Sequence, residues 1–188
     1  NGYPTSYPEV ARAATTNTRV LIKDSVKLAK DLSAYKTLPP IGKASAAEDL
    51  QLTMLYARAL DPTGREVSRD DLSQIKSTYN LPERFGAAIN ALLEGRELPD
   101  DVSKEFRKIV AGAVDRNEIF AQGAVVQTKL DLMKRGVKDW NPGIAMEGDK
   151  MNPYVLQPET TEEQFKETVG VGEWFYNDAT KQVLKRIK

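Results

Sequence analysis

Apolar residues recur at helical spacing in short blocks between residues 46 and 114, and each block ends at a Pro or a Gly. In one block, Phe85, Ile89 and Leu92 fall at i, i+4 and i+7, which places them on one face of an α-helix. Gly95 follows this block and a Pro stands shortly after it, so the backbone turns there and a new helix begins. The pattern therefore predicts a compact unit of several short helices.

Capping signals mark where these helices begin. Ser45 with Glu48 has the spacing of a capping box, in which the hydroxyl accepts a backbone N–H and the glutamate reaches back. Ser68 precedes two acids, Asp70 and Asp71, in the first turn of the next helix, where the helix dipole favours negative charge. Inside the block we expect four core side chains: Leu55, Phe85, Ile89 and Phe106.

Two longer helices flank the short ones, at residues 11–35 and 98–136. On the first, Leu21, Leu28 and Tyr35 repeat every seven residues, and this repeat predicts an apolar seam. Three lysines of the same helix fall mostly on its other sides: Lys23, Lys27 and Lys30. In the simplest interpretation they form a solvated basic face. In the alternatives, the helix packs against copies of itself in an oligomer, or the lysines bind DNA phosphates without reading the base sequence.

Helical periodicity ends after residue 136. Residues 137–158 contain one turn signal after another, which predicts an irregular strap lying over a neighbouring surface. A short acidic helix follows, capped by Thr160 or Thr161, and residues 173–184 have the aromatic and β-branched pattern of a β-hairpin. A lone hairpin is marginal in water, so we expect these segments to contact a partner. The predicted partner contacts are Trp140, Tyr154, Trp174, Phe175 and Tyr176.

These patterns together predict a mainly α fold in three segments. Residues 1–42 form an N-terminal arm with a long helix, and residues 43–136 form the central helical block. Residues 137–188 form the irregular strap, the short helix and a small C-terminal β-hairpin. The chain starts at Asn1 and not at Met, so we expect it to be a terminal portion of a longer chain.

Composition excludes several classes of chemistry. The chain has no Cys and no His, which excludes disulfides, thiolate nucleophiles, ordinary zinc sites and a Ser-His-Asp triad. The 27 basic and 27 acidic residues balance, which argues against a generally basic surface that coats nucleic acid. No apolar run approaches the roughly 20 residues of a membrane span, and we expect no signal peptide within these residues.

Two acidic pairs, Asp70-Asp71 and Asp100-Asp101, could supply oxygen ligands to Mg²⁺ or Ca²⁺. Neither pair has the spaced acids and glycine of a calcium loop, and both stand where a first helical turn favours negative charge. We therefore interpret them as helix-capping residues. The sequence predicts no catalytic, cofactor-binding or metal-binding residue, and hence no enzyme within these residues.

Two stretches of the central block, DLQLTMLYARALDPTGREVSRDDL and LPERFGAAINALLEGRELPDDVSKEF, resemble a segment of internal virion proteins of tailed bacteriophages. In that family, the inner-core or ejection proteins, an Asp precedes an apolar helix ending in Leu-Asp-Pro, and a Pro-Glu-Arg helix follows. The matching residues are Asp49, Leu60, Asp61, Pro62, Pro82, Glu83, Arg84, Asn90, Gly95 and Leu98. The resemblance implies a place inside the capsid and, on ejection, transiently in the host envelope or cytoplasm.

Three hypotheses for function follow. The first is a structural module that assembles with itself and with the portal or other internal virion proteins, and accompanies DNA delivery into the host. The second is a non-catalytic module of a larger virion enzyme, such as a lytic transglycosylase or a packaged polymerase. The third is a DNA-binding accessory protein that uses the basic face around Lys23, Lys27 and Lys30.

Overall fold

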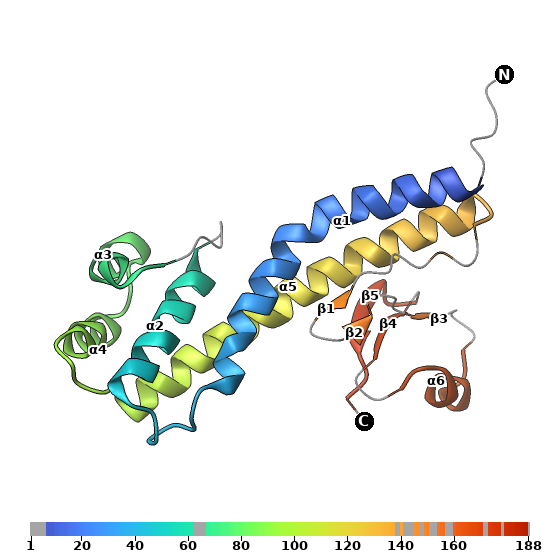
Figure 1. The fold of residues 1–188 in the computed structure, drawn as a ribbon. Helices are drawn as coiled ribbons and strands as arrows, with labels where there is room; N and C mark the ends of the chain where they lie inside the picture. The colour runs from blue at the N-terminus through green and yellow to red at the C-terminus, as the bar shows by residue number, and fades with distance from the viewer. Residues whose placement is uncertain are drawn as a thin grey trace. The chain divides into compact units, whose positions relative to one another are not determined.

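The computed structural model describes residues 7–61, 67–137, 140, 145–146, 149–150, 154–156, 160–170, 173–177 and 179–187. The chain is mainly helical, with a long N-terminal helix and a C-terminal hairpin, as the sequence predicts (Figure 1). Among the described residues the helices are α1 (Tyr7–Leu32), the 3-10 helix η1 (Ser33–Thr37), α2 (Ala46–Leu60), α3 (Arg69–Tyr79), α4 (Glu83–Leu93), α5 (Asp100–Lys134) and α6 (Glu162–Thr168). The strands are β1 (Ala145–Met146), β2 (Asp149–Lys150), β3 (Tyr154–Leu156), β4 (Trp174–Asn177) and β5 (Gln182–Lys185).

The chain forms two compact units that do not follow the three predicted segments. One unit combines Asn1–Lys27 with Asn117–Lys188, and the other is Leu28–Arg116. The difference arises because α1 and α5 are continuous helices, and each contributes one part of its length to each unit. No helix in the described part of the chain is long and apolar enough to cross a membrane.

Local capping chemistry sets the starts of α2 and α3 in unit Leu28–Arg116. The capping box at α2 is present, with the Ser45 N–H donating to Glu48 Oε2 at 2.7 Å. At α3, the Ser68 N–H donates to Asp71 Oδ2 at 2.8 Å, so this acid caps the helix as predicted. Gly95 has φ +91° after α4, a conformation that side chains disfavour, and this residue ends the helix. Pro62, one of the matching residues of the phage-like pattern, lies outside the described residues.

An aromatic cluster fills the core of this unit. The rings of Tyr56 and Phe106 stack with centroids 3.8 Å apart, and Phe85 meets both edge-on, at 6.2 and 5.3 Å. Phe85, Ile89 and Phe106 are buried, as predicted. Leu55 is only half-buried, which corrects its assignment to the core. Its neighbour Tyr56 takes the inward position on α2 and is 1% exposed.

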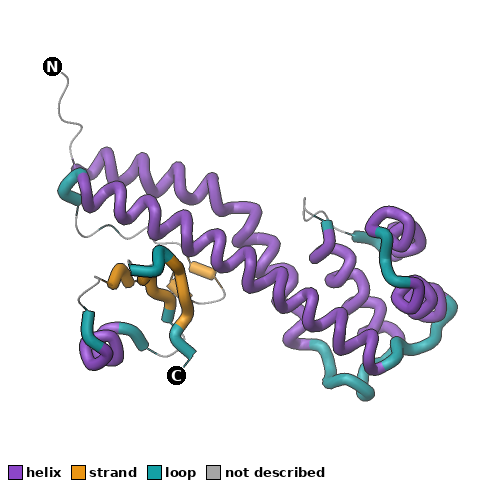
Figure 2. The backbone as a smooth tube through the Cα atoms, turned by 180° about the vertical axis from the view of Figure 1, so that it is seen from behind, coloured by secondary structure: helices purple, strands orange, loops and turns teal. Residues whose placement is uncertain are grey.

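In the other unit, α1 lies against the second half of α5 (Figure 2). The hydroxyls of Thr18 and Thr128 are 2.9 Å apart and join the two helices. The buried seam of α1 runs through Thr18 and Ile22 and not through Leu21, which is 60% exposed. The buried seam therefore passes through Ile22, one position after the predicted Leu21. The shift is possible because the apolar face of α1 is wider than the strip that α5 covers.

The C-terminal residues of this unit form a three-stranded sheet in the order β3-β4-β5. The predicted hairpin is present, since β4 and β5 pair antiparallel with Trp174 opposite Lys185. Within residues 137–158, β3 corrects the strap interpretation, because it pairs in parallel with β4 and so has a partner from within the chain. Strands β1 and β2 pair antiparallel. Thr161 caps α6 and accepts the Gln164 N–H at 3.3 Å, so the predicted capping box is confirmed.

Candidate functional site

A groove of about 570 Å³ lies in the unit formed by Asn1–Lys27 and Asn117–Lys188. One wall comes from α1 and the other from the last turns of α5, the two helices seen together in Figure 2. Val10, Ala14 and Leu21 provide the apolar part of the α1 wall, and Leu132 provides it on α5. A concave surface lined by apolar side chains between helices is a common place for a ligand or a partner helix to bind.

Charged and hydroxyl groups accompany this apolar lining. Glu9 lies on the α1 side, and Asp131 and Arg135 lie on the α5 side, while the paired hydroxyls of Thr18 and Thr128 also line the groove. The small side chains on α1 let another backbone approach closely. The groove therefore suits a helix with an apolar stripe and charged flanks better than it suits a small polar substrate.

The second feature is the basic face of α1. Lys23, Lys27 and Lys30 are all exposed, and none of them has an ion pair among the described residues. Their spacing of four and three residues places them on one side of the helix. This arrangement agrees with the predicted basic face and leaves open what it binds.

Unit Leu28–Arg116 contains a buried carboxylate with a structural partner. Asp49 is 4% exposed, and its Oδ2 accepts the backbone N–H of Leu98 at 2.8 Å. Burial raises the pKa of Asp49, and the nearby charge of Glu97 adds to the rise, while the bond from Leu98 and the charge of Arg107 oppose it. Asp49 and Leu98 are both positions of the phage-like pattern, and here they hold the start of α2 to the chain that leads into α5.

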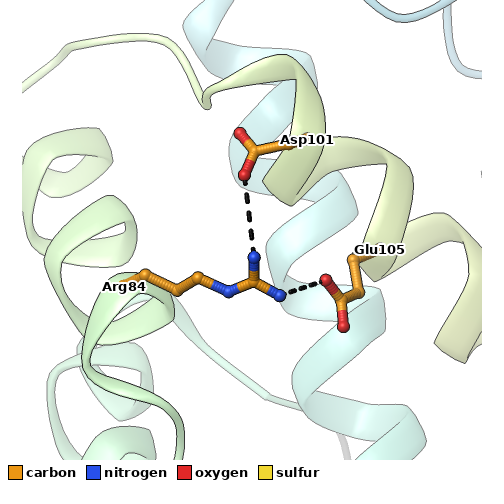
Figure 3. Close-up of polar contacts among 3 residues, drawn as sticks. All are labelled: Arg84, Asp101 and Glu105. Atoms are coloured by element: carbon orange, nitrogen blue, oxygen red, sulfur yellow. Dashed lines mark hydrogen bonds and ion pairs between the residues drawn. The ribbon is translucent and has the colours of Figure 1, made fainter.

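Arg84, a third position of that pattern, joins α4 to α5 on the surface of the same unit (Figure 3). One Nη atom lies 2.5 Å from Glu105 Oε2 and the other lies 3.9 Å from Asp101 Oδ2. The guanidinium also lies over the Phe85 ring, 4.8 Å from its centroid. Asp101 thus stands in the first turn of α5 beside a cation, in agreement with a capping role.

Four of the five predicted aromatic contacts to a partner are buried inside the chain. Trp140, Trp174, Phe175 and Tyr176 are each at most 9% exposed, so they cannot serve as surface anchors in this conformation. The Trp140 indole N–H donates to Thr15 Oγ1 at 3.0 Å, and Phe175 packs edge-on against Phe165 of α6 at 4.9 Å. The prediction assumed a hairpin without its own packing partners, whereas α6 and β3 supply them. The side chain of Tyr154 lies outside the described residues.

Among the described residues, no group of three or more acids is placed to hold a metal ion. In the same part of the chain, burial and the nearby charge of Glu105 raise the pKa of Tyr56 to about 12. This phenol belongs to the aromatic core with Phe85 and Phe106. The sequence analysis missed the groove, and the available signal was the width of the apolar face of α1.

Comparison with known proteins assigns no function to the groove or to the basic face of α1. No protein-family model matches the chain, and searches of curated proteins and of solved structures found no similar protein.

Proposed function

We propose that this chain is a non-enzymatic structural module of an internal virion protein, which assembles with itself and with the portal or other inner-core proteins and accompanies DNA delivery. Two lines of argument support the proposal. The phage-like pattern coincides with residues that hold one helical unit together, such as Asp49, Leu98 and Arg84. We expect the residues of such a pattern to have structural roles in a protein whose function is assembly.

The observation that carries the proposal is the uncovered apolar lining of the α1–α5 groove. Leu21 lines this groove and is 60% exposed, although its position in the heptad repeat is typical of a packed residue. A helix of a second copy that entered the groove would cover Leu21 and the half-buried Val10 together. Because Leu21 is already partly buried, covering the rest of it contributes about 1–2 kcal/mol, enough to change a self-association constant roughly tenfold.

The test is sedimentation velocity of the full chain over a range of concentrations, with Leu21→Asp as the variant. Ile119→Asp is the matched control, since Ile119 is 47% exposed on α5 and does not line the groove. We expect concentration-dependent self-association that Leu21→Asp weakens at least tenfold and Ile119→Asp leaves unchanged. Circular dichroism should show equal helix content in all three proteins.

A chain that stays monomeric at its highest soluble concentration would contradict self-assembly. The absence of cysteine offers a direct test in the particle. A Leu21→Cys variant carries a single thiol, and a cross-linker attached there identifies the protein that covers the groove. Cross-links to other copies, the portal or inner-core proteins support the proposal, and cross-links to none of them count against it.

A further inference from the structure

Helix α1 presents three different faces within the unit Asn1–Lys27 with Asn117–Lys188. Successive residues of an α-helix are rotated by about 100°. One face, with Thr18 and Ile22, is buried, and a second, with Val10 and Leu21, lines the groove. The third face carries four cations within an arc of about 80°: Arg12, Arg19, Lys23 and Lys27. Lys30 continues this arc on the part of α1 that belongs to the other unit.

Three cations of this third face are available to a partner. All four are exposed, and Arg12, Lys23 and Lys27 have no ion pair in the described part of the chain. From Arg12 to Lys27 the face extends about 22 Å along the helix axis, at 1.5 Å per residue. Two exposed acids stand near these cations: Glu9 lies at the Lys27 edge of the arc, in the first turn of α1, and Asp24 lies about 60° outside the arc.

We propose that this basic face of α1 binds the phosphates of duplex DNA without reading its base sequence. Lysine is a point charge that binds phosphate and adds no sequence information. The arc contains no aromatic side chain that could stack on the bases of a single strand. It also lacks the large apolar residues that a helix inserts into a lipid surface, apart from Val20 at its edge.

The DNA-binding face is distinct from the groove of the proposed assembly. The two lie on opposite flanks of the strip through which α1 is buried, so the groove can hold a protein while the basic face holds DNA. The balanced charge of the whole chain does not oppose this, because the attraction depends on the local arc of cations. The inference therefore stands whether or not the chain self-assembles.

The test measures binding of the full chain to a fluorescent DNA duplex at several salt concentrations. For three to four phosphate contacts, log K should fall with log[KCl] with a slope of about −2.7 to −3.6. The variant Lys23→Gln with Lys27→Gln should reduce the magnitude of this slope by about 1.8. Lys104→Gln with Lys108→Gln is the matched control, because these two lysines are also exposed, four residues apart and on a helix, α5.

We expect the control to bind as the unchanged chain does, and duplexes of unrelated sequence to bind equally well. Equal helix content by circular dichroism shows that both variants are folded. Three outcomes would overturn the proposal: no DNA binding at low salt, an equal loss in the control, or lysine-dependent binding to phosphatidylserine vesicles without binding to DNA.

Discussion

Replacement of Asp49 tests the physical account of unit Leu28–Arg116 most directly. Its carboxylate is 4% exposed and accepts the N–H of Leu98, itself 6% exposed, at 2.8 Å. Asp49→Ala leaves this N–H buried without an acceptor, which should destabilise the unit by about 1–3 kcal/mol. Asp49→Asn keeps an oxygen at the same position. We therefore expect this variant to lose less than Asp49→Ala at neutral pH.

The two variants should also differ in the pH dependence of stability. Burial raises the pKa of Asp49 above its ordinary value of 3.8, so the folded unit favours the protonated carboxyl. The stabilisation from this proton is fully present below the ordinary value and is lost as the pH rises through the raised pKa of the folded state. Asn does not titrate in this pH range, so Asp49→Asn removes the contribution of residue 49 to the pH dependence of folding stability.

Two measurements check the prediction. Hydrogen exchange of the Leu98 amide reports the opening of this bond directly, and its protection should fall in Asp49→Ala more than in Asp49→Asn. Urea unfolding, followed by circular dichroism from acid to neutral pH, gives the stability of each variant. Equal losses in both variants at neutral pH, or unchanged Leu98 exchange in Asp49→Ala, would refute the assigned role.

Three further predictions concern the same unit. Phe106→Ala removes the ring stacked on Tyr56 and should cost about 3–5 kcal/mol in urea unfolding. In Gly95→Ala the added Cβ meets no atom within 4 Å, but the residue must adopt φ +91°. Backbone strain should therefore lower the free energy of unfolding by about 1–3 kcal/mol, which thermal unfolding measures. The Tyr56 phenol, with its pKa raised to about 12 from the ordinary value of 10.0, should ionise late in an absorbance titration, and folding stability should fall between pH 10 and 12.

The parts of the fold that depend on local chemistry could be predicted from the sequence. Ser45 with Glu48 and Thr161 with Gln164 form capping boxes, because a cap needs only residues within one turn of each other. The aromatic core at Phe85 and Phe106 followed from periodicity. Leu55 was assigned wrongly because Tyr56 beside it is also apolar, and only the packing partner decides which one points inward.

The groove could not be predicted for a related reason. Leu21 and Ile22 are adjacent apolar residues, and periodicity accommodates a seam through either one. Contact with α5 buries Ile22 and leaves Leu21 in the open groove. The same limit applies to β3, whose three residues are too few to show a period and whose partner, β4, is distant in the chain.

The strand order of the C-terminal sheet also has a consequence for the order of its assembly. β4 and β5 are joined by a short turn, and hairpins of this kind close in about 1–10 μs. β3 can pair with β4 only after the chain that contains α6 has closed into a longer loop, which is slower. During synthesis, β3 leaves the ribosome before its only described partner strand exists. The first of the three strands to be made is therefore the last to be paired.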